Sequence, residues 1–295
     1  MAVSGPVSLA LDARAMLGEG PVWDTARQCL WFVDIKSHAV WCLDPQSGTS
    51  QWIEAPDQVG WVLPTSTGRL LAGLKSGLHL LDPVTRQFEK TATIPGEPAH
   101  NRLNDACTDR AGRVWFGSMD DNEEAKTGRF YRYERGTIVA AGPAGVTITN
   151  GPAVNGRADL VYFSDTLGRR IFVAELGEDG LPGEPRLFVD IAQDFAGAYP
   201  DGPVVDAEGC VWTGLWNGWA VARYSPEGRL METVSLPVAN VTKLAFGGAD
   251  LMTAFVTTAR KGLDEAALEA QPQAGGVFTF RSGVAGLATT PVEMT

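Results

Sequence analysis

The chain has 295 residues and a formal net charge of −11, from 24 Lys and Arg against 35 Asp and Glu. Acid is in excess and no basic cluster is present, so nucleic acid and an anionic membrane surface are not expected as partners. No apolar run approaches the length of a membrane span, and residues 1–11 lack the basic start and apolar core of a signal peptide. We therefore expect a cytoplasmic protein that works as a monomer.

The cysteines and histidines are too dispersed to form a zinc site or a disulfide framework. No two of the four cysteines form a Cys-x-x-Cys pair, and the three histidines are isolated from one another. We expect buried free thiols in a reducing compartment, at Cys29, Cys42, Cys107 and Cys210.

The chain repeats one unit of short strands along its whole length. Its 34 glycines, 18 prolines and 9 tryptophans favour many short strands and turns over helices. Six aromatic or apolar strands each follow a turn, and their first residues lie 40 to 51 positions apart, close to the period of a propeller blade. These strands are predicted at residues 30–33, 70–73, 114–117, 160–163, 211–214 and 251–255. Each is followed by a second strand of alternating character, at residues 39–43, 77–81, 129–133, 170–174, 220–224 and 277–280.

Four short strands in each of six units predict an all-β fold, a six-bladed β-propeller. A β-sandwich is the rival fold, but a sandwich has no reason to repeat a whole four-strand unit six times. The sequence contains no linker or low-complexity segment, so a single domain is expected over residues 1–295. A helix is predicted over residues 263–270, between two strands of the last blade. Residues 9–13 and 287–292 are candidates to share a blade and close the ring.

Polar residues recur at one position of the repeating unit. This position lies ten or eleven residues before the aromatic strand, at the end of the innermost strand, where a propeller has the mouth of its central channel. Its occupants are Glu19, Gly60, Asn104, Asn150, Asp201 and, in the last unit, Asn240 or Val241. Three of them stand on similar Gly-Pro corners, at residues 19–21, 150–152 and 201–203. Four oxygen-bearing side chains from different blades would thus converge on one axis.

The convergence of these four side chains predicts a bound cation. Two carboxylates and two amides in a narrow channel repel one another and are poorly hydrated unless a cation neutralises them. All four are oxygen donors, which favours a hard divalent cation such as Ca²⁺, Mg²⁺, Mn²⁺ or Fe²⁺ over structural zinc. Three or four protein ligands leave positions open for water or substrate. The alternative is that each corner supplies only an Asx-type turn, and three corners in register favour the cation.

Several strings of residues, in this order, resemble the SMP-30/gluconolactonase/regucalcin family, and among its members the bacterial sugar lactonases such as xylonolactonase. They stand at residues 17–23, 102–105, 115–119, 149–152, 199–202 and 259–263. The resemblance implies a six-bladed propeller with one divalent metal in its channel, whose identity stays open among Ca²⁺, Zn²⁺, Mn²⁺, Mg²⁺ and Fe²⁺. By match of motif it implies Glu19, Asn150 and Asp201 as metal ligands and Asp201 as the general base. Arg102 and Asn104 match the substrate-binding residues.

The expected function is the metal-dependent hydrolysis of a sugar-acid lactone, such as xylono-, arabinono- or gluconolactone, to the free aldonate in sugar catabolism. The metal would polarise the lactone carbonyl and lower the pKa of a bound water. The expected partner is therefore a small-molecule sugar lactone. One alternative is a calcium-dependent arylesterase or phosphotriesterase on the same fold, and another is a non-enzymatic binding propeller.

Some charged and aromatic residues near these motifs have two interpretations. Where many family members carry Met-x-Glu-Glu, residues 119–124 read Met-Asp-Asp-Asn-Glu-Glu, and we expect a solvated acidic loop there. Arg260 and Lys261 are expected either in a solvated loop or as charges that lead into the following helix. Arg102 either pairs with a surface acid at a strand end or contacts the ligand. Four tryptophans could line a sugar site or pack between blades, namely Trp23, Trp61, Trp216 and Trp219.

Overall fold

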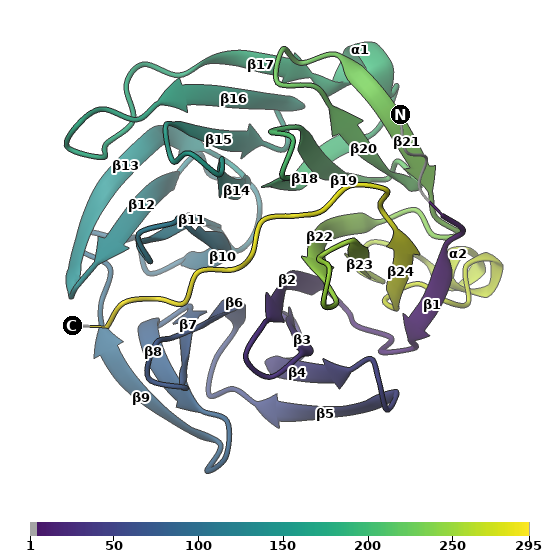
Figure 1. Cartoon of the computed structure of the whole chain (residues 1–295), viewed down its shortest axis with the longest axis horizontal. Helices are drawn as coiled ribbons and strands as arrows, with labels where there is room; N and C mark the ends of the chain where they lie inside the picture. The colour runs from purple at the N-terminus through teal and green to yellow at the C-terminus, as the bar shows by residue number, and fades with distance from the viewer. Residues whose placement is uncertain (1–4, 295) are drawn as a thin grey trace.

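The structure, a computed structural model, describes residues 5–294. Within these residues the chain forms 24 strands and two short helices. Figure 1 shows the sheets standing side by side around a central axis, as the blades of a propeller do. The fold is thus all-β and propeller-like, as predicted. No helix within residues 5–294 is long and apolar enough to cross a membrane.

Four sheets are each built from four consecutive strands. They are β2 (Gly18–Asp24), β3 (Cys29–Asp34), β4 (Ala39–Asp44) and β5 (Thr49–Glu54), followed by β6 (Val59–Pro64), β7 (Leu70–Leu74), β8 (Gly77–Asp82) and β9 (Gln87–Ala92). The next two are β10 (Asn101–Thr108), β11 (Val114–Asp120), β12 (Gly128–Glu134) and β13 (Thr137–Val146), then β14 (Thr149–Val154), β15 (Leu160–Asp165), β16 (Arg170–Glu175) and β17 (Arg186–Asp190).

The remaining eight strands form one sheet. It holds β18 (Tyr199–Val205), β19 (Val211–Trp216), β20 (Ala220–Tyr224) and β21 (Leu230–Ser235), together with β22 (Val241–Gly247), β23 (Thr253–Thr258), β24 (Val277–Arg281) and β1 (Ser8–Leu11). A single parallel pair, Gly202 with Lys243, joins β18 to β22. Every other pairing in this sheet is antiparallel, so antiparallel pairing alone divides it into two sets of four strands.

The predicted aromatic strands are present as β3, β7, β11, β15, β19 and β23, and the second strands as β4, β8, β12, β16, β20 and β24. The last aromatic strand begins two residues later than predicted, because Leu251 lies in a turn with a φ of 56°. Helix α1 spans Ile191–Asp194. Helix α2 spans Glu265–Ala270, between β23 and β24 as predicted, and begins two residues later than predicted. Asp264 begins α2, since its Oδ1 accepts a hydrogen bond from the Ala267 N–H at 2.8 Å.

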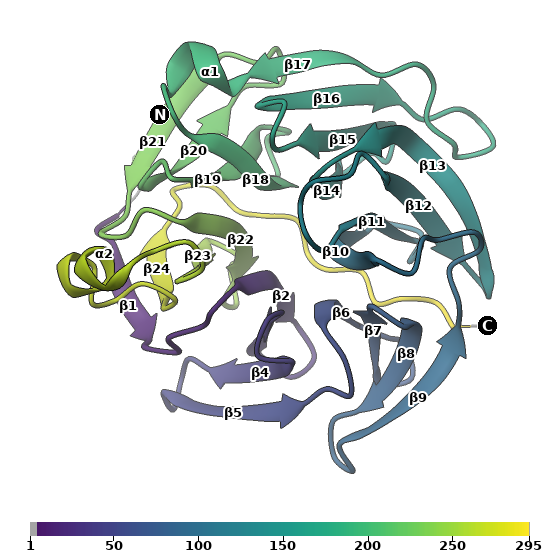
Figure 2. The ribbon, with the colours of Figure 1, turned by 180° about the vertical axis from the view of Figure 1, so that it is seen from behind.

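The two ends of the chain are placed differently from the prediction. Strand β1 pairs with β24 and takes its outer edge, as expected for residues 9–13. The prediction for residues 287–292 was wrong, because they form no strand of that sheet and Val292 instead forms an isolated bridge with Thr65. Figure 1 shows the C-terminal segment crossing the central opening, and Figure 2 shows it from behind. It is held there by backbone hydrogen bonds, such as Val292 N to Pro64 O at 2.8 Å.

Aromatic rings fill the space between neighbouring sheets. Trp61 on β6 packs on Phe116 of β11 with 5.7 Å between ring centroids, and Phe130 on β12 meets Phe163 of β15 at 4.7 Å. Trp23 on β2 stacks on Phe255 of β23 at 5.6 Å. Packing between blades is therefore the role of Trp23 and Trp61. Each sheet depends on the next for its apolar contacts, which explains why the aromatic strand recurs once in every unit.

All four cysteines are free thiols, as expected. Cys29 and Cys210 are buried, whereas Cys42 and Cys107 are half-buried. Burial raises the pKa of the Cys107 thiol to about 12.

Candidate active site

The innermost strands bring the predicted polar residues into one cavity of about 140 Å³. Its lining includes Glu19 from β2, Arg102 and Asn104 from β10, Asn150 from β14 and Asp201 from β18. These five side chains come from four separate segments of the chain. The convergence predicted from their common position in the repeat is thus confirmed.

A β-bulge re-aims the backbone at each of these positions. Register shifts fall between Glu19 and Val22, between Asn150 and Ala153, and between residues 200 and 203. A bulge breaks the alternation of side chains and turns one out of the sheet plane. The glycines and prolines after Glu19, Asn150 and Asp201 therefore serve to direct these side chains along the channel axis.

The other two aligned positions do not contribute to the cavity. A Cβ on Gly60 would lie 2.4 Å from the carbonyl oxygen of Leu103, so only glycine allows β6 to approach β10 so closely. Asn240 Nδ2 instead donates to the carbonyl oxygen of Lys261 at 2.9 Å. Asn240 thereby holds the segment that carries Lys261 rather than facing the channel.

Glu19 and Asp201 form a crowded, buried pair of carboxylates, each only 4% exposed. Burial and the charge of Asp105 raise the pKa of Glu19 to about 7, and burial and the charge of Glu19 raise the pKa of Asp201 well above its usual range. Glu19 Oε2 accepts one hydrogen bond, from the Gly20 N–H at 3.1 Å. Asp201 Oδ1 has no hydrogen-bond partner in the described part of the chain. A buried carboxylate oxygen without a hydrogen-bond donor is energetically costly, and a bound cation would remove that cost.

The two asparagines are held by a hydrogen-bond chain. Asn104 Nδ2 donates to Asn150 Oδ1 at 2.9 Å and to the carbonyl oxygen of Thr149 at 2.6 Å. Asn150 Nδ2 donates to Thr166 Oγ1 at 2.9 Å. The amide oxygen of Asn150 is therefore on the side of Asn104. A carbonyl oxygen accepts at two lone pairs, so Asn150 Oδ1 can still bind a cation. Asn104 thus positions Asn150 in addition to its predicted contact with substrate.

Arg102 is buried at 3% exposure and does not sit at the surface. Its Nη1 donates to Asn104 Oδ1 at 2.6 Å and to the carbonyl oxygen of Leu103 at 3.2 Å. Its Nε lies 3.3 Å from Asp121 Oδ1. The sequence offered a surface ion pair or a contact with the ligand for Arg102. The structure places Arg102 on the cavity wall, where it also contacts Asp121.

The two predicted solvated loops are solvated only in part: Asn122 and Glu124 are exposed, whereas other charged residues of these loops are not. Asp120 is buried and accepts N–H groups of its own turn, including that of Ala125 at 2.8 Å. Glu123 and Lys261 both line the cavity and form an ion pair with each other. Each loop thus supplies one of two opposite charges on the cavity wall. Sequence reasoning missed both residues as members of the site, although Lys261 stands in one of the strings that carry the family resemblance.

Aromatic and apolar side chains complete the walls. Trp216 and Tyr199, at the ends of β19 and β18, line the cavity together with Leu167. Trp219 is 44% exposed and is outside the lining. Of the four tryptophans considered, Trp216 is therefore the one that a sugar in this cavity would meet.

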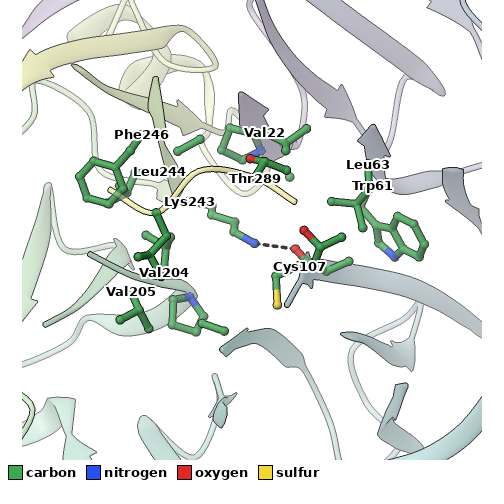
Figure 3. A pocket seen from close by; sticks show the side chains of 18 of the residues that line it. Val22, Trp61, Leu63, Cys107, Val204, Val205, Lys243, Leu244, Phe246 and Thr289 are labelled. Atoms are coloured by element: carbon green, nitrogen blue, oxygen red, sulfur yellow. Dashed lines mark hydrogen bonds between the residues drawn. The ribbon is translucent and has the colours of Figure 1, made fainter. Parts of the chain in front are cut away.

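A buried ion pair lies next to these side chains, and no sequence motif predicted it. Lys243 Nζ lies 2.5 Å from Asp105 Oδ1 and donates to the carbonyl oxygen of Ala106 at 3.0 Å. Asp105 Oδ2 accepts the N–H of Gly151 at 2.8 Å, directly after Asn150. Figure 3 shows Lys243 among the residues of a second cavity. This cavity has a volume of about 110 Å³, and C-terminal residues 287–289 contribute to its lining.

Together these features describe one end of the channel, with two carboxylates, an amide oxygen and an arginine around a small cavity. The profile of the SMP-30/Gluconolactonase/LRE-like region matches residues 17–260, which include all of them. The chain belongs to this family. Within residues 5–294, no group of three or more His, Cys, Asp and Glu side chains is placed to hold a metal ion. A metal in this SMP-30-like site would therefore need the amide oxygen of Asn150 as its third protein donor.

Members of the SMP-30/gluconolactonase family match this chain over nearly its whole length. The 6-deoxy-6-sulfogluconolactonase of Pseudomonas putida is 32% identical over 274 residues, which cover 93% of this chain and 94% of that protein. The L-arabinolactonase of Azospirillum brasilense is 32% identical, over 97% of this chain and 95% of its own. The solved structure of regucalcin from Agrobacterium tumefaciens, described as a calcium-binding protein, is 29% identical with a TM-score of 0.92, over 98% of this chain and 97% of that one.

Proposed function

We propose that this protein hydrolyses the lactone of a sugar acid to the free aldonate, with a divalent cation bound by Glu19, Asn150 and Asp201. The observation that carries the proposal is the buried Asp201 carboxylate, which lacks a donor for Oδ1 among residues 5–294 and lies beside Glu19 in a cavity walled by Arg102. Relatives across the whole chain are named sugar lactonases, which supports this reaction. With the eight-stranded sheet counted as two sets of four, we take the fold as six blades around the proposed metal.

The donors fit a hard cation. Two carboxylates and one amide, all oxygen ligands, suit Ca²⁺, Mg²⁺ or Mn²⁺ better than a soft metal that prefers sulfur. A divalent ion would cancel the two negative charges of Glu19 and Asp201, whose burial otherwise disfavours their ionised forms. The relative described as a calcium-binding protein makes Ca²⁺ the first ion to test.

The reaction adds water to the carbonyl carbon of the lactone and breaks the bond between that carbon and the ring oxygen. When bound, the cation would supply Lewis-acid polarisation of the carbonyl group. Asp201 accepts a proton from the attacking water, and that proton ends on the hydroxyl released from the ring. Because a carboxylate that binds a cation is a weaker base, Glu123 on the cavity wall is the second carboxylate able to share this role.

Positioning falls to Arg102. Its guanidinium is anchored on Asp121 and Asn104, so it faces the cavity at little further cost in side-chain entropy. Planar paired N–H groups suit the hydroxyl and ring oxygens of a sugar lactone. Trp216 and Leu167 provide apolar surface for the carbon face of the ring and keep bulk water from the reacting carbon.

A lactone panel tests the proposal. Purified protein is stripped with a chelator and assayed on five- and six-carbon aldonolactones, alone and with Ca²⁺, Mg²⁺, Mn²⁺, Zn²⁺ or Fe²⁺ restored. We expect hydrolysis to disappear with the chelator and to return with one or more ions. Hydrolysis that survives complete removal of metal would refute the cation, and turnover of aryl esters or phosphotriesters in place of lactones would refute the substrate.

A further inference from the structure

Three basic side chains surround one carboxylate beside the candidate site. Lys36 Nζ lies 2.6 Å from Asp121 Oδ1, Lys75 Nζ lies 3.0 Å from Asp121 Oδ2, and Arg102 Nε lies 3.3 Å from Oδ1. Gln58 Nε2 also donates to Asp121 Oδ2, at 2.8 Å. We call these five residues the Asp121 cluster. These five residues lie at or next to the ends of strands in the first three sheets.

The cluster carries an excess of positive charge. Three cations and one carboxylate give +2, counted as three minus one. Burial alone raises the pKa of Asp121, but hydrogen bonds from Lys36, Gln58 and Lys75 hold it well below its usual range, so the carboxylate stays ionised. In a chain with a net charge of −11, a local excess of two positive charges is not explained by average composition.

The excess remains when the rest of the site is included. Glu123 and Lys261 cancel each other, and so do Asp105 and Lys243. Glu19 and Asp201 contribute −2, which the proposed divalent cation would cancel. Asp34 accepts backbone N–H groups, such as Leu17 N at 3.0 Å, and is not counted here because it forms no ion pair with these side chains in the described part of the chain. Among the ion-paired groups of the site, the Asp121 cluster is therefore the one in which cations outnumber carboxylates.

The cluster adjoins the cavity through Arg102 and is partly open to solvent. The side chains of Lys36 and Lys75 are 25% and 28% exposed, so they are neither sealed in the core nor free in solvent. Lys75 uses one of its three N–H groups, on Asp121, and Lys36 uses two, on Asp121 and Gln58. Arg102 joins the two regions, because it lines the cavity and also contacts Asp121. A ligand that fills the cavity and extends past Arg102 would meet the remaining ammonium donors.

We propose that the Asp121 cluster binds an anionic substituent of the substrate, a carboxylate, sulfonate or phosphate on the sugar carbon farthest from the lactone carbonyl. The inference rests on the proposed lactonase function and names its substrate class. The competing interpretation is that the cluster only braces Arg102. If the cluster only braces Arg102, its loss should lower kcat/KM equally for neutral and anionic lactones. If it binds the anion, its loss should lower the ratio of anionic to neutral kcat/KM.

The test compares gluconolactone with six-carbon lactones that differ only at carbon 6, carrying a phosphate, a sulfonate or a carboxylate there. We expect wild-type kcat/KM to be higher for at least one anionic lactone than for gluconolactone. In Lys75→Gln and Lys36→Gln the ratio of anionic to neutral kcat/KM should fall about tenfold, the loss of one hydrogen bond between charged groups. Lys90→Gln, at an exposed lysine on β9, is the matched control and should keep the ratio.

Asp121→Asn provides a change in the opposite direction. It removes a negative charge, so the ratio of anionic to neutral kcat/KM should stay the same or rise, even if the loss of the Arg102 contact lowers both values. The proposal is overturned if the wild type does not prefer any of the anionic lactones, or if Lys75→Gln lowers neutral and anionic kcat/KM equally.

A binding measurement separates this inference from the lactonase proposal. If no lactone is hydrolysed, the proposed function fails, and the cluster is tested with inorganic sulfate and phosphate. At matched ionic strength, these anions should raise the melting temperature of the wild type and of Lys90→Gln more than that of Lys36→Gln/Lys75→Gln. Equal increases in all three proteins would show that the cluster does not bind anions.

Discussion

Lys243 and Asp105 form an ion pair across the channel, with Nζ 2.5 Å from Oδ1 and side chains only 6% and 1% exposed. The stem of Lys243 packs on Gly202, where an added Cβ would lie 2.7 Å from the lysine Cγ and Cδ. Asp105 accepts the N–H of Gly151. The pair thus contacts the residues that directly follow two candidate metal ligands, Asn150 and Asp201, and supports both corners.

Breaking this ion pair should be costly. Lys243→Met leaves the Asp105 carboxylate buried without its partner, and we expect a loss of about 3–5 kcal/mol in the free energy of unfolding. The double variant Asp105→Asn/Lys243→Met should recover part of that loss, because no uncompensated charge remains. Urea unfolding of the wild type, Lys243→Met, Asp105→Asn and the double variant gives the coupling free energy. A single variant that lost less than about 1 kcal/mol would show that the pair is not important for stability.

The proposed metal ligands can be tested apart from catalysis. Asp201→Ala and Asn150→Ala should each lower the bound metal after dialysis, because each removes an oxygen donor, whereas the fold is retained. Metal content by mass spectrometry and far-UV circular dichroism measure the two effects. Asp165→Ala is the control, since Asp165 caps its own turn by accepting the Gly168 N–H at 3.0 Å. Full metal occupancy with full activity in Asp201→Ala or Asn150→Ala would contradict the assignment.

The metal-free protein should become less stable as the pH rises. Burial and Asp105 raise the pKa of Glu19 from 4.5 to about 7, while Lys243 and the Gly20 N–H oppose the rise. A group whose pKa is raised in the folded state favours folding most below its unfolded pKa, and this contribution is lost as the pH passes the folded value. Between pH 5 and pH 8 the loss is on the order of 3 kcal/mol.

Thermal melts in chelator across this pH range measure the effect. Glu19→Gln should flatten the profile, and saturating Ca²⁺ should do the same in the wild type, because the cation favours the ionised carboxylates. A metal-free melting temperature that did not change from pH 5 to pH 8, or rose, would contradict the raised pKa.

Arg102 should matter for turnover more than for metal binding. Arg102→Ala should lower kcat/KM on the best lactone by about tenfold to a hundredfold, as expected for the loss of a hydrogen bond from a charged group. Arg102→Lys should restore little, since an ammonium cannot make the paired planar contacts of a guanidinium. Steady-state kinetics and metal content decide the point. If kcat/KM is unchanged in Arg102→Ala, its role is structural.

The repeat and its polar corners could be predicted from the sequence alone. Short strands, turns and aromatic positions are encoded by neighbouring residues, so their period of 40 to 51 residues is visible in the chain. Glu19, Asn150 and Asp201 occupy the same position of that repeat. Once the units are arranged in a ring, equivalent positions must face one axis, and this is why the convergence could be predicted without coordinates.

The tertiary structure decided the contacts that cross the ring. Lys243 reaches Asp105, and Lys261 reaches Glu123, each across 138 positions of sequence, and neither pair stands at a repeated position. The C-terminal segment likewise lies over the channel because β1 already covers the edge of β24. Local residue patterns encode the hydrogen bonds within a blade. Charges on different blades acquire partners only when closure of the ring brings them together, so these pairings have no local pattern in the sequence.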